Sequence, residues 1–352
     1  AQDASPLDGL SAAEYDRLNT ILTESGKTND TTQYVTVTLD EPEKQSVLTW
    51  QKGDPLTRRG LAVIYQDQQL YEAVVNITEG SVEAWELQEG AQPILLDQVW
   101  MLSQVLPRQS EQWAEALKRR GINDPKSVFC FPVFPGYFDL PRDEENTRLG
   151  MVSCYETSSE NGLWGRPVEG LLAIINYNER RIIDILDRDV IPIPDGGPAV
   201  PSDQPTDIPA RGPAAQRFNI SGSWVEWDKW TFHLRIDPRE GPVLSQVSIN
   251  DEGTQRSVMY QGALSELFVP YMDPTETWFH RAYLDIGEYG IGTSGVKLRK
   301  GKDCPADSVL MSGTFMNQQG NVSTKDDIVC IFERTTGDTA WTHFEAARGG
   351  TS

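Results

Sequence analysis

The sequence predicts an α+β protein: two small repeated α+β domains, followed by part of a large all-β sandwich. The order helix, strand, hairpin occurs twice before residue 191, and from Phe218 only short strands and turns are expected. Between them, residues 191–216 are rich in Pro, Gly, Ser and Asp, which is typical of a linker. The expected division is 1–95 and 96–195 for the small domains, 196–217 for the linker and 218–352 for the β region.

The first domain opens with a clear helix start. Ser11 and Glu14 have the spacing of a capping box, Leu18 and Leu22 lie on one apolar face, and Gly26 ends the helix. Strands with alternating polarity follow at Tyr34–Leu39, Gly60–Tyr65, Leu70–Ile77 and Val82–Leu87.

The second domain repeats this order. Ser110 is expected to cap a helix in which Trp113 faces inward. The hairpins Leu61–Ile77 and Leu171–Leu186 occupy similar places in the two halves, so we interpret the halves as two copies of one domain. The strands predicted here are Ser127–Val133, Leu149–Tyr155, Leu171–Asn176 and Arg181–Leu186.

The β region does not close on itself in the sequence pattern. Trp224, Trp227 and Trp230 precede the alternating strand Thr231–Ile236, and they are expected to pack in a core or an interface. Half a sandwich would leave an apolar face and several strand edges in water, at a cost above the usual net stability of about 5–15 kcal/mol. We therefore expect another chain to supply the missing strands, through a cleaved precursor or a split gene. The other strands predicted are Val243–Ile249, Arg256–Tyr260, Val309–Thr314 and Ile328–Phe332.

Charge limits the possible partners. The 52 acidic and 31 basic residues give a net charge of −21, which repels a phosphate backbone and argues against nucleic acid. The same field would steer cationic small molecules toward the protein, with solubility as the alternative explanation. No stretch of about 20 apolar residues occurs, so no membrane span is expected.

The four cysteines form two pairs that are local in the sequence. Cys130 and Cys154 fall on neighbouring predicted strands, where a cross-strand disulfide is geometrically possible, and Cys304 and Cys330 form the second local pair. Zinc is the alternative, but there is no Cys-x-x-Cys and no nearby pair of histidines. Two disulfides imply an oxidising compartment, so the chain is expected to be secreted or periplasmic.

Several longer motifs resemble those of the copper amine oxidases. Cys304 and Cys330 bracket a segment as the disulfide of that family does, and Pro6–Ser11 and Arg166–Leu171 extend the resemblance over the whole chain. The most specific motifs are Trp230–His233, Gly241–Ser245, Ser265–Pro274 and Tyr283–Gly290.

The resemblance implies an enzyme that oxidises primary amines to aldehydes and releases ammonia and hydrogen peroxide. It also implies two small cystatin-like domains and a β-sandwich that forms a two-fold dimer. Its cofactors are copper, held by three histidines, and topaquinone, made from the tyrosine of an Asn-Tyr-Asp/Glu motif. The enzyme would then need a second polypeptide that carries both cofactors.

This chain contains neither cofactor motif. No His-x-His pair occurs, and the histidines His233, His280 and His343 are far apart, so no metal site is expected. Asn176-Tyr177 looks a little like the quinone motif, but it falls in a predicted hairpin turn and is discounted. Residues absent from this chain are therefore expected to carry the copper and the topaquinone.

Asp285 is the candidate catalytic base. Amine oxidation requires a weakly acidic proton to leave the carbon next to nitrogen, and a carboxylate in a dry pocket can take it. Asp285 has apolar neighbours, and the resemblance assigns the base to the aspartate of this motif. The alternative from local sequence is an acid that caps a turn beside Gly287.

Aromatic residues complete the candidate site. By resemblance, Tyr271 hydrogen-bonds a quinone oxygen and Tyr283 forms the gate of the amine channel. Tyr283 lies two residues before Asp285, so both would point to the same side of a strand. Phe134, Pro135 and Tyr137 are candidates for the channel wall. Ordinary packing of buried aromatics is the alternative for all of them.

Two hypotheses of different class remain. The first is a subunit of an amine oxidase that supplies the base, and the second is a truncated, non-catalytic relative that binds amines or a partner protein. The intact Asp285 and Tyr271 favour the enzyme. The sequence does not name the amine, although the acidic balance favours cationic amines such as diamines.

Overall fold

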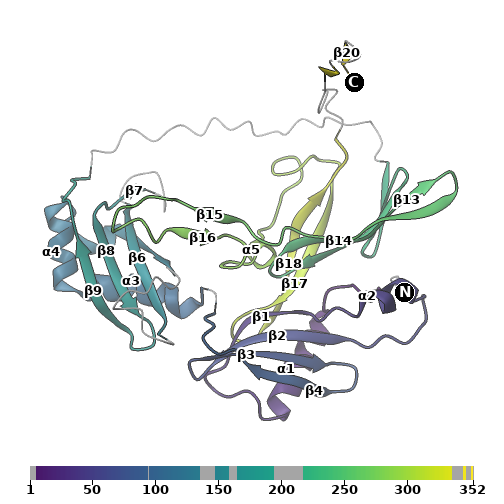
Figure 1. Cartoon of the computed structure of the whole chain (residues 1–352), viewed down its shortest axis with the longest axis horizontal. Helices are drawn as coiled ribbons and strands as arrows, with labels where there is room; N and C mark the ends of the chain where they lie inside the picture. The colour runs from purple at the N-terminus through teal and green to yellow at the C-terminus, as the bar shows by residue number, and fades with distance from the viewer. Residues whose placement is uncertain are drawn as a thin grey trace.

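Strands dominate the molecule and helices are few. The computed structural model describes residues 5–93, 95–134, 147–157, 165–193, 217–334, 344–345 and 350–351. Figure 1 shows two compact units, each with helices against a sheet, and an extended β region above and beside them. None of the helices in these ranges is long and apolar enough to cross a membrane.

The first unit packs one helix against an antiparallel sheet. Helix α1 (Ala12–Glu24) begins at the predicted capping box, because Ser11 and Glu14 each bond the other's backbone N–H. Leu18 and Leu22 are fully buried against the sheet, so the predicted apolar face is confirmed. The sheet has the order β1-β2-β3-β4, and a short helix, α2, that was not predicted follows β1. These elements are β1 (Gln33–Leu39), α2 (Lys44–Thr49), β2 (Arg59–Gln66), β3 (Gln69–Asn76) and β4 (Ser81–Leu87).

The second unit packs two helices on its sheet. Ser110 caps α4 by accepting a hydrogen bond from the N–H of Trp113, whose ring is fully buried as predicted. Helix α3 was not predicted: it has no side-chain cap, and Pro107 lies in its last turn. Cys130 and Cys154 are directly opposite each other on β5 and β6 and form the predicted disulfide. The elements are α3 (Asp97–Gln109), α4 (Glu111–Arg119), η1 (Pro125–Ser127), β5 (Val128–Val133), β6 (Leu149–Glu156), β7 (Arg166–Pro167), β8 (Leu171–Asn176) and β9 (Arg181–Asp187).

The predicted pairing of hairpins between the two units was wrong by one strand. The hairpin Leu171–Leu186 joins the third and fourth strands of the β5-β6-β8-β9 order, so its counterpart is β3–β4 and not Leu61–Ile77. The turns agree in detail: Asn76 and Asn176 each accept a hydrogen bond from the N–H of a glutamate three residues on. The error arose because β2 and β3 are joined by a tight turn, whereas their counterparts β6 and β8 are separated by residues 157–170.

The β region contains an open sheet. Five antiparallel strands run in the order β10 to β14, and among the described residues β14 pairs only with β13. Nearly every residue of β14 is exposed, so both of its faces are uncovered. Cys304 and Cys330 form the second disulfide. The elements are β10 (Phe218–Ser221), β11 (Trp224–Trp227), β12 (Trp230–Asp237), β13 (Gly241–Asp251), β14 (Thr254–Gly262), β15 (Phe268–Pro270), β16 (Ala282–Leu284), α5 (Ile291–Ser294), β17 (Val309–Met316), β18 (Val322–Ile331), β19 (Phe344–Glu345) and β20 (Gly350–Thr351).

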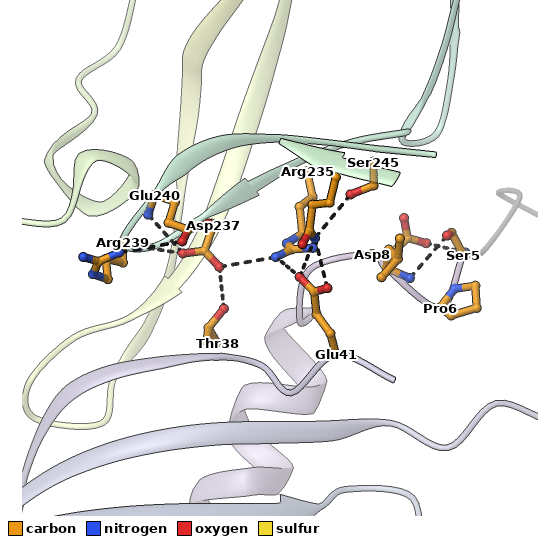
Figure 2. Close-up of polar contacts among 12 residues, drawn as sticks. Ser5, Pro6, Asp8, Thr38, Glu41, Arg235, Asp237, Arg239, Glu240 and Ser245 are labelled. Carbon is orange, nitrogen blue, oxygen red and sulfur yellow. Dashed lines mark hydrogen bonds and ion pairs between the residues drawn. The ribbon is translucent and has the colours of Figure 1, made fainter. Parts of the chain in front are cut away.

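An ion pair and hydrogen bonds, all with at least one buried partner, join the first unit to this sheet (Figure 2). Arg235 on β12 pairs with Glu41, and the buried Asp237 accepts a hydrogen bond of 2.6 Å from the hydroxyl of Thr38. Nearer the middle of the strand, the fully buried ring of His233 lies 2.9 Å from Asp8. Breaking such buried contacts leaves charges without partners, so they fix the first unit against the sheet.

Replacing Asp8 by alanine is expected to lower the free energy of unfolding by about 1–3 kcal/mol, because the buried Nε2 of His233 loses its partner. Burial acts to raise the pKa of Asp8, but hydrogen bonds from His233, Ser223 and the backbone of Ser5 outweigh it and hold the pKa below 3.8. The ionised carboxylate therefore stabilises the fold above pH 3.8, and its contribution is lost as the pH falls through the lower folded-state pKa.

Urea unfolding at several pH values measures this effect. The difference between wild type and D8A should be constant from pH 7 to about pH 4 and should shrink below that. The exposed Asp30 provides a control, because D30A should change stability by less than about 0.5 kcal/mol. A D8A effect that grows on acidification would contradict the assignment.

Candidate active site

The hairpin β15–β16 brings two of the candidate residues together. It extends from the β region across to the sheet of the second unit (Figure 1). Tyr271 directly follows β15, and its N–H donates to the carbonyl of Arg281 at 2.9 Å. Tyr283 lies on β16, and the two tyrosine rings meet edge to face at 5.4 Å. These side chains therefore form one aromatic cluster, with Tyr271 half exposed.

Asp285 follows the strand instead of lying on it. Strand β16 ends at Leu284, and Asp285 begins a turn over residues 285–289. The prediction that Tyr283 and Asp285 share one side of a strand was therefore wrong. The side chain of Asp285 is exposed in this chain, so the dry pocket expected around it is not formed by the described residues alone.

Glu266 holds this turn in place. Its carboxylate accepts hydrogen bonds from the N–H groups of Ile286 at 2.9 Å and Gly287 at 3.1 Å. Burial acts to raise the pKa of Glu266, but these bonds and that from Leu267 outweigh it and lower the pKa. A side chain at Gly287 would meet the Glu266 carboxylate, with a Cβ 2.8 Å away. The turn-capping acid beside Gly287 is therefore Glu266, which leaves the carboxylate of Asp285 free for another role.

A second carboxylate lies near Asp285, and the sequence reasoning gave it no role. Glu288 is half-buried, and burial raises its pKa, with a further increase from the negative charges of Asp285 and Glu266. Its Oε1 accepts a hydrogen bond of 3.2 Å from the N–H of Leu284. Its place three residues after Asp285, on the same turn, was the signal available in the sequence.

The second unit supplies one wall of the cluster. Phe131 on β5 lies 6.1 Å from the ring of Tyr283, and burial raises the pKa of the Tyr283 hydroxyl. Phe134 contacts Tyr177 and the guanidinium of Arg148, in the core of the second unit rather than at Tyr283. The candidates Pro135 and Tyr137 lie outside the described residues.

The described histidines do not form a copper site. His233 is bound to Asp8, His280 is fully buried on a different element, and His343 lies outside the described ranges. Within those ranges no three His, Cys, Asp or Glu side chains are grouped so that they could hold a metal ion. Tyr177 is buried at the β8–β9 turn, where its hydroxyl lies 2.8 Å from Ser103, as expected of a packing residue.

Comparison with known proteins gives the class of fold first. A copper-containing benzylamine oxidase from Hansenula polymorpha aligns over 99% of this chain and 58% of its own, with a TM-score of 0.78 and 19% identity. Pichia pastoris lysyl oxidase aligns over 98% of this chain and 55% of its own, with a TM-score of 0.74 and 14% identity. The fold is therefore that of the copper amine oxidases.

The sequence comparisons then give the family. Models of the copper amine oxidase N2, N3 and enzyme domains match residues 5–87, 100–199 and 219–352. A primary amine oxidase of Klebsiella aerogenes is 34% identical over 99% of this chain and 47% of its own length. A copper-containing amine oxidase, gamma 1, of Arabidopsis thaliana is 34% identical over 97% of this chain and 50% of its own. The chain belongs to the copper amine oxidase family, and it spans about half the length of these relatives.

Proposed function

We propose that this chain is a subunit of a copper- and topaquinone-dependent amine oxidase, which converts primary amines to aldehydes with release of ammonia and hydrogen peroxide. Membership of the family supports this activity. The observation that carries the proposal is the turn after β16. It begins two residues after Tyr283 and leaves the carboxylate of Asp285 exposed, while Glu266 takes the local capping role.

In this proposal Asp285 is the base that removes the proton from the carbon next to the amine nitrogen. Tyr271 would donate a hydrogen bond to a quinone oxygen, and Tyr283 would line the amine channel. Copper and topaquinone would supply the oxidising chemistry, and we propose that a second polypeptide holds both, since the described residues contain no group of three His, Cys, Asp or Glu side chains that could hold a metal ion. That polypeptide would also cover Asp285 and exclude water from it.

Exposed apolar residues support such a partner. Half of the large exposed hydrophobic side chains in the described ranges lie between residues 258 and 284, on β14 and around the β15–β16 hairpin. Soluble proteins rarely leave such a concentration in water, so we propose that the partner's strands complete the sandwich here. Pairs of the two chains would then assemble with two-fold symmetry. The residues are Val258, Met259, Leu264, Leu267, Phe268, Val269, Tyr271, Met272 and Leu284.

The domain division and the compartment belong to the same proposal. The helix-and-sheet units support small domains at 1–95 and 96–195, with a linker at 196–217 and the enzyme domain from 218 to 352, and we propose the cystatin-like class for both small domains. The two disulfides support a secreted or periplasmic location.

Purification of the native assembly, followed by a denaturing gel, tests the proposed function. We expect the 39.4 kDa chain together with a second band that stains for quinone, and release of peroxide when a primary amine is added. The exposure of Asp285 favours one other candidate, a non-catalytic relative that binds a partner. A lone 39.4 kDa species without quinone or peroxide release would support that candidate instead.

A further inference from the structure

The candidate site contains a buried cation that the sequence reasoning did not single out. We propose that Arg281 determines substrate specificity: its guanidinium disfavours amines with a second positive charge and so selects monoamines with an uncharged tail. This inference rests on the proposed function and adds the class of substrate to it. It runs against the expectation of diamines that the overall acidic charge suggested.

Arg281 is built into the aromatic cluster. Arg281 is only 5% exposed, and its guanidinium stacks on Trp278, with Cζ 3.3 Å from the ring centroid. The Nη1 of Arg281 donates a hydrogen bond to the hydroxyl of Tyr155 on β6 at 3.2 Å. The ring of Trp278 lies 6.0 Å from that of Tyr271, so in space only Trp278 separates the guanidinium from the candidate site.

The position of the cation is fixed from both sides of the cluster. The indole N–H of Trp278 donates to Glu169 of the second unit at 2.9 Å, and the carbonyl of Arg281 accepts from the N–H of Tyr271. Arg281 therefore cannot swing away when a charged ligand approaches, as an exposed arginine would.

The positive charge is only partly balanced. No ion pair in the described ranges includes Arg281, and its Nε has no hydrogen-bond partner there. Asp273 is close enough for the guanidinium to lower its pKa, after the larger effects of the hydrogen bonds from Thr275, but this carboxylate is itself bonded to Thr275 at the surface. Arg281 therefore places a guanidinium without an ion-pair partner in the described ranges beside Tyr271 and Tyr283, where the nearby carboxylates are Glu169, bonded to Trp278, and Glu288, whose charge also acts on Tyr283.

This local field acts differently from the field of the whole protein. The overall charge of −21 attracts every cationic amine from a distance, but salt screens it beyond about 8–10 Å. A buried charge is screened much less, so Arg281 acts on the part of the substrate that passes the aromatic cluster. A monoamine has only its reacting nitrogen to place there, whereas a diamine brings a second ammonium. The expected discrimination against that ammonium, at about 8 Å and an effective dielectric constant near 20, is roughly 10- to 30-fold.

The test uses the assembled, quinone-containing enzyme and two substrates of equal size, 1-aminopentane and 1,4-diaminobutane. We expect wild type to favour aminopentane in kcat/KM. R281M removes the charge and keeps an unbranched, flexible side chain, so it should raise the relative kcat/KM of the diamine about tenfold. R281K keeps the charge and should retain the wild-type preference. Arg188, an exposed arginine paired with Glu276, provides the matched control, because R188Q should leave the ratio unchanged.

Each outcome decides the proposal. An equal or better kcat/KM of wild type for the diamine would overturn it, even if R281M fails to assemble. So would active R281M with the wild-type ratio, or a change of ratio in R188Q as large as in R281M. If wild type oxidises neither these amines nor any other, the proposed function fails and the inference falls with it. Loss of discrimination in active R281M but not in R281K would establish the role of the charge.

Discussion

Replacing Asp285 by asparagine in the assembled enzyme is expected to lower kcat for a primary amine by about 10²- to 10⁴-fold, which is the usual contribution of a positioned base. An amide has the shape of the carboxylate but cannot accept the proton. The side chain of Asp285 is exposed and holds no other described residue, so D285N should fold and assemble like wild type. Peroxide release at saturating amine measures kcat, and KM should change little.

Two variants make this prediction specific. Asp251, exposed at the end of β13 and paired with Arg256 at 3.6 Å, provides a matched control, because D251N should leave kcat unchanged. Glu288 is the neighbouring carboxylate whose pKa is raised by burial, so E288Q tests whether Glu288, and not Asp285, accepts the substrate proton. Full activity in D285N together with a large loss in E288Q would transfer the role of base to Glu288.

Elements with local signals could be predicted from the sequence. The capping box of Ser11 and Glu14 and the cap at Ser110 depend on atoms at most three residues apart, so the sequence contains all that is needed to recognise them. The strands of the small units have the alternating or continuous apolar patterns that a half-covered or fully covered sheet requires. The disulfide of Cys130 and Cys154 followed from two such strands being neighbours.

The features that were missed depend on distant contacts. Helix α3 has no side-chain cap, so its start carries no local mark. The true counterpart of the β8–β9 hairpin could not be recognised because strand order depends on pairing in space, although the asparagine turns at Asn76 and Asn176 contained the information. Spacing along the chain likewise cannot reveal that Thr38 binds Asp237, 199 residues away.

The candidate site was predicted in its residues but not in its geometry. The motif around Asp285 identified this residue as the candidate base, yet the alternating pattern suggested that the strand continues through it. The turn forms because Glu266, 20 residues from Ile286, binds two successive N–H groups that a strand would have used for pairing. Arg281 has no local signal, since its burial comes from packing against Trp278 and Tyr155.

Replacing Arg120 by methionine is expected to lower the free energy of unfolding of the second unit by about 3–5 kcal/mol, because the partly buried carboxylate of Asp187 and several backbone carbonyls lose a fully buried guanidinium. Its Nη1 lies 2.8 Å from the carboxylate of Asp187. The other nitrogens donate to the carbonyls of Glu169 at 2.8 Å and Arg188 at 2.8 Å, and methionine can satisfy none of them. Urea unfolding of the purified assembly, followed by tryptophan fluorescence, to which the buried Trp113 contributes, measures the loss.

The adjacent Arg119 provides the matched control for burial, because it pairs with the same carboxylate, Asp187, from the surface. Its side chain is half exposed, so R119M should cost less than about 1 kcal/mol. Equal losses in the two variants would show that Asp187, and not burial, sets the effect. Arg120 also holds the backbone of Glu169, whose carboxylate accepts from Trp278 beside Arg281. R120M should therefore weaken amine selectivity as well as stability, whereas R119M should leave selectivity unchanged, because the contact with the backbone of Glu169 is made by Arg120.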